Sequence, residues 1–319
     1  MITTDLRELL RYAVLAPSSH NTQCWKFRLA ENSIAILPDF SRRCPVVDPD
    51  DHHLFVSLGC AAENLLHAAL EAGFAGSTCF ITEGDGEIRI NFEKTSAMRT
   101  PFFDAIPRRQ STRSEYDGTA VSNNELHLLE QAGTGKGVRV MLLTEKSMME
   151  QVLEYIVQGN TAQMRDPAFV AELKSWIRFS ESDAVRLSDG LFSRCTGNPS
   201  APRWLGNVLF NMFFKEKAEN DKCARQVRSS AGIAVFVSES DDPAHWVEAG
   251  RTYERFALQA TALGIHTAHL NQPVEVRSIR PQFASALNIK SGRPDLIIRF
   301  GRGAEMPRSL RRAIESVLI

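Results

Sequence analysis

Three clusters of polar and cationic residues lie far apart in the sequence, and each could bind an anion or a polar ring. The first is a loop near the N-terminus that offers hydroxyl, amide and backbone N–H groups, at Pro17, Ser18, Ser19, Asn21 and Gln23. Such groups can hydrogen-bond a heteroaromatic ring whose edge alternates donors and acceptors. This loop is therefore a candidate binding segment.

The other two clusters are rich in arginine, whose planar guanidinium suits bidentate contact with phosphate. One contains Arg108, Arg109, Ser111 and Arg113, and the other closes the chain with Arg302, Arg308, Ser309, Arg311 and Arg312. In a chain with a net charge of −1, two such clusters suggest convergence on one anion. Taken alone, each cluster is more typical of a solvated surface.

Two further segments have weaker chemical signals. The run Asp48, Asp50, Asp51, His52 and His53 contains metal-ligand residue types, but it suits a solvated helix start better, and we expect no metal. The glycine-rich residues 133–137 lack the Lys-Ser/Thr pair of a phosphate-binding P-loop and predict a plain turn. The six cysteines form no C-x-x-C pair, which indicates buried free thiols.

Hydrophobic periodicity predicts the elements that must position these clusters. Apolar runs bounded by turn residues predict strands at 25–29, 33–37, 77–82, 87–92, 138–143, 232–237, 265–269 and 296–300. Long, largely apolar helices are expected at 53–72 and 243–263, the second opened by Pro243 and ended by Gly264. Helices and strands mixed in this order predict an α+β fold.

The two long helices resemble each other in sequence. Residues 59–73 and 250–264 align without a gap at an offset of 191, with Gly, Glu, Ala and Gly at matching positions. Buried helices share Ala and Leu by composition, but this coincidence favours a true internal duplication. We therefore expect two tandem, unequal halves related by a pseudo-twofold axis, residues 1–100 and 101–319.

The second half contains a much longer segment between its first strand and its long helix. We expect an insertion at about residues 150–226, with exposed aromatic residues at Trp204, Phe210, Phe213 and Phe214. An insertion of this size in one half only could form a lid over a site, or it could add helices with a packing role. The sequence favours neither alternative.

Taken together, the three clusters resemble the FMN-binding motifs of the nitroreductase superfamily, and more narrowly its Acg-like branch of two fused halves. Residues 17–25 are similar to the family's P-S-x-x-N-x-Q-P-W loop, with Cys24 in place of the second proline. Residues 108–113 resemble its R-R-S-x-R motif with Gln110 inserted, and residues 306–311 resemble its basic C-terminal motif. The segment 248–272 looks like the helix and strand that end beside flavin N5.

The resemblance implies a nitroreductase-like, three-layer α/β/α fold that binds FMN with groups from both halves. The implied cofactor contacts are Pro17, Ser18, Ser19, Asn21 and Gln23 from the first half, and Arg108, Arg109, Ser111, Arg113, Arg308, Ser309 and Arg311 from the second. Backbone N–H groups of Asn271 and Gln272 would lie near N5. No catalytic side chain is implied, because the flavin carries the redox chemistry.

A second FMN site, related by the pseudo-symmetry, would need its own copies of these motifs. It would require an arginine motif before residue 6 and a serine-rich loop near residues 131–137, and neither segment has one. We therefore expect one FMN per chain, in a monomer that imitates a nitroreductase dimer.

These implications support three functional hypotheses. The first is an oxidoreductase that passes hydride from NAD(P)H through FMN to a nitroaromatic or quinone-like acceptor. The second is a protein that stores, sequesters or senses FMN beneath a lid, with little turnover. The third is a degenerate fold kept as an interaction module, which predicts no flavin.

Composition narrows the class of partner. The chain has 319 residues, of which 43% are apolar and 24% charged, as in soluble globular proteins. It has no overall basic charge to hold nucleic acid or an anionic membrane, no bilayer-spanning apolar run and no signal-peptide pattern. We expect a cytoplasmic protein that acts on a small molecule.

Overall fold

The computed structural model describes residues 2–319, and its first half contains a four-stranded antiparallel sheet in the order β1-β2-β4-β3. The elements are α1 (Ile2–Ala13), β1 (Trp25–Leu29), β2 (Ser33–Pro38), α2 (His52–Glu71), β3 (Phe74–Ile81) and β4 (Glu87–Lys94). The strands predicted here are confirmed. Alternation along β4 buries Ile88, Ile90 and Phe92 against the helices and leaves the opposite face open.

The second half repeats this order of elements. It contains α4 (Asn123–Ala132), β5 (Val138–Leu143), β8 (Gly232–Ser238), α10 (Pro243–Ala262), β9 (His266–His269) and β10 (Arg293–Gly301). Its sheet has the order β5-β8-β10-β9, so both sheets place the first, second, fourth and third strands of their half side by side. This shared topology is what a tandem duplication predicts.

Helices cover both faces of the second sheet, which completes three layers there. α4 and α10 lie on the inner face, and the outer face is covered by α5 (Lys146–Arg165), α9 (Glu216–Arg228), α11 (Gln272–Glu275) and α12 (Arg280–Ala286). Alternation along β8 explains this arrangement, because Phe236 packs inward while Val235 and Val237 pack outward. The ends of the expected insertion, α5 and α9, are therefore part of this layer.

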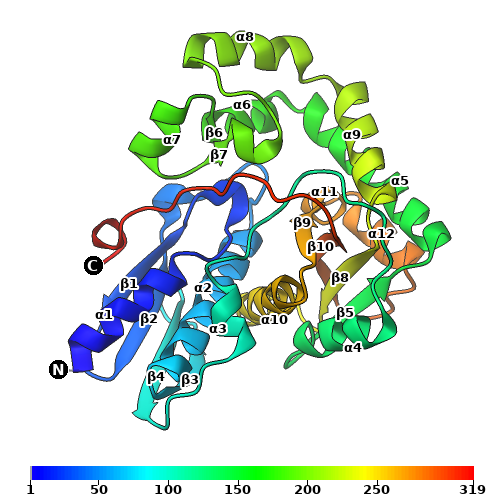
Figure 1. The fold of residues 1–319 in the computed structure, drawn as a ribbon. Coiled ribbons are helices and arrows are strands. Elements are labelled where there is room, and N and C mark those ends of the chain that lie inside the picture. Colours follow the sequence, from blue (N-terminus) through cyan, green and yellow to red (C-terminus); the bar gives the residue numbers. More distant parts are fainter. Residues whose placement is uncertain (1) are drawn as a thin grey trace.

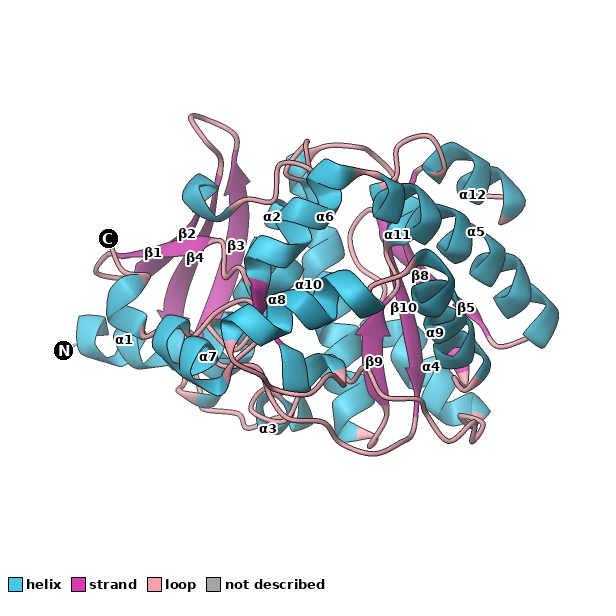
Figure 2. Cartoon of the chain, turned by 90° about the horizontal axis from the view of Figure 1, so that it is seen from above, coloured by secondary structure: helices cyan, strands magenta, loops and turns pink. Residues whose placement is uncertain are grey.

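The long helices α2 and α10 pack against each other between the two sheets (Figure 2). They meet at two glycines that the sequence alignment makes equivalent. A Cβ added to Gly59 would overlap the carbonyl oxygen of Val247, and a Cβ added to Gly250 would overlap that of Val56. Since Val56 and Val247 are also equivalent at the offset of 191, the contact is reciprocal, as a pseudo-twofold axis requires.

Two segments connect the halves across the top of the molecule in Figure 1. Residues 166–215, here called the cap segment, contain α6 (Pro167–Trp176), β6 (Ile177–Arg178), α7 (Glu181–Leu187), β7 (Leu191–Phe192) and α8 (Arg203–Phe213). After β10 the C-terminal tail crosses beneath the cap segment to the first sheet, where Phe27 N donates to Val317 O at 2.7 Å. The tail therefore carries basic residues of the second half to the first.

None of the helices within residues 2–319 has both the length and the apolar character that a bilayer crossing requires.

Candidate active site

A cavity of about 280 Å³ lies between the two halves and brings the three sequence clusters together. Twelve of the fourteen residues proposed from the sequence line it: Pro17, Ser18, Ser19, Asn21, Arg109, Ser111, Arg113, Asn271, Gln272, Arg308, Ser309 and Arg311. Residues separated by almost the whole chain therefore form one wall. The connection after α3 (Pro101–Ala105) brings the first arginine cluster here, where Thr112 N donates to Thr267 O beside β9.

Two residues proposed from the sequence lie outside the cavity wall. Arg108 is exposed, and its Nε donates back to the carbonyl of Asp104 at 3.1 Å, so its guanidinium points away from the cavity. Gln23 is buried and acts as a bridge: its Nε2 donates to Ser188 O, and its Oε1 accepts from Arg312 N at 2.7 Å. The arginine motif that faces the cavity is therefore Arg109-x-Ser111-x-Arg113, without an inserted residue.

The cavity wall has an excess of positive charge. Among the side chains that the structure describes, residues 6–319, no carboxylate lies within ion-pair distance of Arg113, Arg308 or Arg311. Burial, assisted by the neighbouring charge of Arg109, lowers the pKa of Arg311 to about 9, although Glu254 opposes the shift. Burial also lowers the pKa of Arg113. An anion in the cavity would offset both effects, since it would favour the charged guanidinium.

Arg109 differs from these arginines because it has an anionic partner. Its Nε lies 3.0 Å from Glu254 Oε1 on α10, and its Nη2 donates to Leu15 O at 2.8 Å. Burial raises the pKa of Glu254 to about 7, although the charge of Arg109 opposes the rise. The pair thus fixes the position of Arg109 at the junction of the two halves.

The loop at residues 17–23 is held in an uncommon backbone conformation. His20, Asn21 and Gln23 have φ angles of 50°, 54° and 53°, in the left-handed region. Such residues cost free energy unless their surroundings impose the conformation, and they cluster at functional sites. Here Asn21 Nδ2 donates to Gly190 O at 3.0 Å in the cap segment, and Gln23 N donates to Ser18 Oγ at 2.8 Å.

The structure adds wall residues that the sequence did not identify. They include His20 from the loop, His53, Ser57 and Cys60 from α2, Tyr253 from α10, and Glu275 from α11, and His269 from β9 also lines the cavity. Burial lowers the pKa of His20 to about 4 and that of His269 to about 3, with smaller contributions from Arg113, so both rings are neutral. Only the meeting of the two halves makes these residues neighbours, and periodicity along one helix does not show what lies opposite it.

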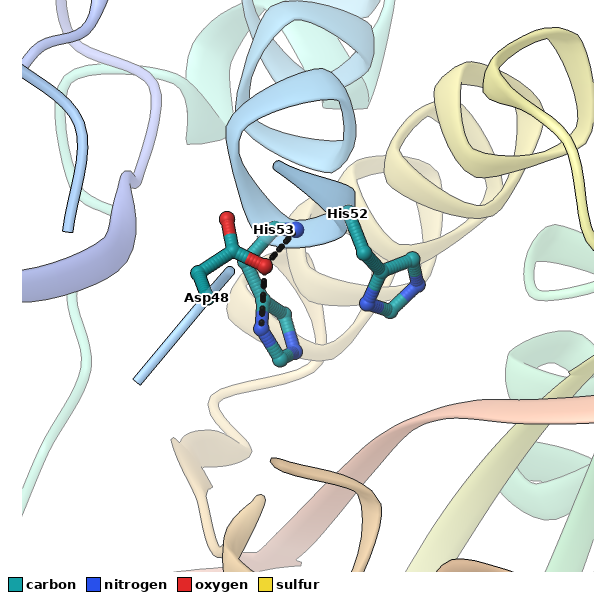
Figure 3. A group of neighbouring side chains, drawn as sticks. All are labelled: Asp48, His52 and His53. Carbon is teal, nitrogen blue, oxygen red and sulfur yellow. Dashed lines mark hydrogen bonds and ion pairs between the residues drawn. The ribbon is translucent and has the colours of Figure 1, made fainter. Parts of the chain in front are cut away.

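The interpretation of Asp48, His52 and His53 as a solvated helix start is wrong, because all three are buried where the two halves meet. Asp48 Oδ1 and Oδ2 accept the backbone N–H groups of His53 and Leu54 at the start of α2 (Figure 3). His52 Nε2 lies 2.9 Å from Asp295 Oδ1, and His53 Nδ1 lies 3.6 Å from Asp48 Oδ1. One ligand atom of each residue lies within 4.8 Å of the others, so they could hold a metal ion.

The cap segment closes one side of the cavity, but not with its aromatic residues. Leu191 and Cys195 line the cavity, whereas Trp204 and Phe213 on α8 are 70% and 64% exposed. Asp189 anchors the cap segment to the first half, because its carboxylate pairs with Arg42 and also with Arg178 of β6. Trp204 and Phe213 are therefore exposed, as the sequence predicts, and lie on the outer surface of the cap segment away from the cavity.

A network of ion pairs surrounds Glu63, the residue related to Glu254 by the pseudo-symmetry. Glu63, the equivalent of Glu254, lies 3.0 Å from Arg251 Nε and 3.1 Å from Arg255 Nη1. Burial alone would raise the pKa of Glu63, but His67, Arg255 and Arg251 outweigh it and bring the pKa to about 2. Arg255 Nε also donates to Ala132 O at 3.3 Å, which holds the turn at residues 133–137 against this network.

Comparison with known proteins identifies relatives that match nearly the whole chain. “Putative NAD(P)H nitroreductase Rv3131” of Mycobacterium tuberculosis is 23% identical over 329 residues, covering 98% of this chain and 90% of the relative. “Putative NAD(P)H nitroreductase acg” of the same organism is 21% identical over 329 residues, covering 99% and 96%. No family model matches the chain.

Solved structures with related folds cover about two thirds of the chain. A nitroreductase of Desulfitobacterium hafniense with bound FMN covers 69% of this chain and 98% of its own, with 13% identity and a TM-score of 0.43. The FMN-dependent nitroreductase NfnB of Mycobacterium smegmatis, in complex with NADPH, covers 68% and 96%, with 11% identity and a TM-score of 0.44. The chain is therefore similar over nearly its whole length to proteins named as putative NAD(P)H nitroreductases, Acg among them.

Proposed function

We propose that the cavity binds one FMN and that the protein is an NAD(P)H-dependent oxidoreductase of the nitroreductase type. The observation that carries this proposal is the convergence of three separate sequence clusters on one cavity between the halves. The acceptor class is a nitroaromatic or a quinone. The relatives' names also support an NAD(P)H-dependent activity.

The residues at the cavity fit a phosphate-bearing cofactor. Arg113, Arg308 and Arg311 have no anionic partner among the described side chains of residues 6–319, and the fork geometry of arginine suits phosphate oxygens. We assign the phosphate to this group, together with Ser111 and Ser309. Removal of a dianion from water into such a site is favourable only where several cationic donors meet it.

Buried polar atoms without partners fit the polar edge of a flavin. In the described part of the chain, Asn21 Oδ1, Gln110 Nε2 and Oε1, Gln272 Oε1 and His269 Nδ1 are buried and make no hydrogen bond. Their residues all line the cavity. Because buried polar groups are nearly always paired, this concentration at one site indicates a missing polar ligand. A ring system with alternating donors and acceptors would satisfy them.

The protein's contribution would be binding, orientation and the exclusion of water. Bound FMN would supply two-electron transfer between NAD(P)H and the acceptor. The guanidinium groups would hold the cofactor and stabilise its added negative charge. Backbone N–H groups at Asn271 and Gln272, where β9 leads into α11, would face its reactive edge.

The first test is an anaerobic visible absorbance spectrum of the purified protein before and after NADPH or NADH. We expect flavin absorbance that bleaches with the nucleotide and returns when 1,4-benzoquinone is added. A protein that is purified without flavin and does not bind added FMN would contradict the proposal.

The cap segment supports a second candidate function, in which the protein sequesters FMN. The carboxylate of Asp189 pairs with Arg42 and Arg178, and Ser188 and Gly190 accept hydrogen bonds from Gln23 and Asn21. These contacts fasten the cap segment beside the cavity. If they keep nicotinamide out, bound flavin is reduced slowly in the wild type.

An Asp189→Asn variant distinguishes the two candidates. Sequestration predicts slow flavin reduction by NADPH in the wild type and faster reduction, or loss of FMN, in the variant. Asp183→Asn is the matched control, because it removes an exposed ion pair with Arg186 within the same segment. Rapid reduction of the wild-type flavin, unchanged by Asp189→Asn, rules out sequestration.

A further inference from the structure

The inner face of α8 packs on the rest of the cap segment through apolar residues four positions apart. A Cβ added to Gly206 would lie 2.5 Å from Phe179 Cγ, so the helix backbone rests directly on that ring. The rings of Phe179 and Phe210 meet edge to face with their centroids 6.3 Å apart, and Phe214 stacks on Phe210 at 4.4 Å. This contact fixes which side of α8 faces away from the protein.

The outer side of α8 carries a second set of apolar residues, which the described chain does not cover. Trp204, Val208 and Met212 recur every four residues and so lie on one side of the helix. With Phe213 in the last turn they form the outer patch, whose members are between 49% and 70% exposed. These are four of the eleven large apolar side chains that the described residues expose. A concentration of this kind on one helix marks an interaction surface.

The net charge of −1 is spread unevenly, and the stretch that contains α8 is cationic. Residues 190–215 include three basic residues and neither aspartate nor glutamate. Lys174 of α6 adds a cation beside the helix, because its Nζ donates to Asn211 Oδ1 at 3.0 Å. The carboxylate of Asp183 on the neighbouring α7 pairs with Arg186 at 2.8 Å.

The cations near the outer patch have no anionic partner of their own. Among the described side chains of residues 6–319, no carboxylate lies within ion-pair distance of Arg203, Lys174 or Lys215. Glu216, the first acidic residue after this stretch, pairs instead with Arg165 of α5. An anionic partner would therefore meet these charges without displacing a carboxylate.

The position of α8 indicates which kind of partner fits. The helix forms the upper edge of the molecule in Figure 1, and no other element lies beyond it there. The outer patch is therefore a ridge, whereas recognition of a peptide helix or strand uses a groove or a free sheet edge. A second copy of this chain would bring two cationic ridges together, and like charges repel.

We propose that α8 docks the protein on the surface of an anionic lipid bilayer, with the helix in the plane of the interface. The outer patch enters the boundary between headgroups and acyl chains, where tryptophan and other apolar side chains are stabilised. Arg203 and Lys215, at the two ends of the helix, face the lipid phosphates. Docking does not depend on a flavin, because no residue of α8 lines the cavity.

Sedimentation of the full-length protein with lipid vesicles tests this docking. We expect binding to vesicles of mixed phosphatidylglycerol and phosphatidylcholine, weak binding to phosphatidylcholine alone, and loss of affinity as salt rises. A Trp204→Gln/Phe213→Gln variant should bind about 10-fold more weakly or worse, because two large apolar side chains no longer leave water. Arg203→Gln/Lys215→Gln should weaken binding about 5-fold for each charge removed.

Matched controls remove the same kinds of side chain elsewhere. Met98→Gln/Ile319→Gln replaces two apolar residues that are 52% and 63% exposed and lie outside the cap segment. Lys94→Gln/Lys290→Gln removes two exposed cations outside it. Both control proteins should bind vesicles as the wild type does. All substituted residues are exposed, so every variant should keep the wild-type Tm.

Trp204 also reports insertion directly, because it is the one exposed tryptophan among the described residues. Trp25 and Trp246 are buried, and Trp176 is half-buried. Lipids with brominated acyl chains should therefore quench the emission of Trp204 when the protein binds. A Trp204→Phe variant should still sediment with the vesicles but lose this quenching.

The remaining outcomes separate the bilayer from other partners. Absence of binding to phosphatidylglycerol vesicles at low salt overturns the proposal, as does unchanged binding of Trp204→Gln/Phe213→Gln. A wild-type dimer that this variant dissociates, seen by size exclusion with light scattering, would assign the outer patch to a second copy instead. None of these measurements uses NADPH or flavin absorbance, so failure of the proposed oxidoreductase function does not affect them.

Discussion

Arg113 is a half-buried cation at the cavity wall, and no anion of the described chain lies beside it. Replacement with methionine should therefore weaken FMN binding about 10- to 100-fold, the usual cost of losing a hydrogen bond to a charged group. The apoprotein should keep its Tm or gain slightly, because a poorly solvated charge is removed. Fluorescence titration with FMN and thermal melts measure the two effects.

Arg108→Met is the control for that experiment, since Arg108 is adjacent in sequence but its guanidinium lies outside the cavity. It should bind FMN as tightly as the wild type. If both variants lose affinity equally, general electrostatic attraction holds the cofactor, and the assignment of Arg113 as a direct contact is wrong.

Glu254 and Glu63 occupy equivalent positions but should respond to pH with opposite signs. Burial raises the folded-state pKa of Glu254 to about 7, so its contribution to stability is complete below pH ~4.5 and is lost as pH rises through 7. The wild type should lose at most about 3 kcal/mol of its free energy of unfolding in this way, and Glu254→Gln should not show that loss. Urea denaturation from pH 4 to 8 measures the difference.

Glu63→Gln supplies the comparison for the same measurement. The arginines beside Glu63 bring its folded-state pKa to about 2, so its contribution is present above pH ~4.5 and is lost as pH falls. The variant should therefore be less stable than the wild type at pH 7, and this difference should shrink as pH falls from ~4.5 towards 2, if the measurement is extended to that range. If the free energies of unfolding of the two variants depend on pH in the same way, the pKa values of the two glutamates are not shifted in opposite directions.

At the residue scale, the sequence identified the groups that bear recognisable chemistry but not their directions. Arg108 and Arg109 are adjacent and identical in type, so a sequence motif cannot distinguish them. In the structure Arg108 donates to the carbonyl of Asp104, whereas Arg109 pairs with Glu254. His53 was hidden for a different reason. Its neighbours are charged, which suggests solvent, but the second half of the chain covers it.

At the element scale, the crossing of α2 and α10 depends on two glycines. Gly59→Ala and Gly250→Ala would each drive a Cβ into a backbone carbonyl of the other helix, which a rotamer change cannot relieve. Each should destabilise the fold by about 1–3 kcal/mol or more, as overpacking does. Denaturant unfolding of both variants measures this cost.

The two glycine variants also test the pseudo-symmetry, because their contacts are reciprocal. They should lose similar free energies of unfolding. A large loss in one variant and none in the other would mean that the helices are not related by a twofold axis at this point.

Elements with strong local signals were predictable, and those defined by tertiary contacts were not. Alternation along β4 and the opening of α10 at Pro243 marked their elements correctly. The short helices α11 and α12 were not predicted, because each begins beside a proline and is too short to show a period. The role of α5 and α9 as the outer layer of a sheet depends on partners far away in the chain.

At the scale of the whole molecule, the two halves share a sheet topology but differ at equivalent positions. The cavity at Glu254 has Cys60 in its wall, whereas the equivalent of Cys60 is Arg251, which pairs with Glu63 and Glu248. Arg255 completes this network and holds residues 133–137 against it. This network is the physical reason to expect no second cofactor site.

We therefore predict one FMN per chain and a monomer in solution. Light scattering coupled to size exclusion should give the mass of one chain, and flavin released by denaturation should equal the protein in moles. Two flavins per chain would require the network around Glu63 to open, at the cost of separating buried ion pairs. One flavin per two chains would instead mean that a second copy completes the site, and the internal pairing of the halves would not be sufficient for binding.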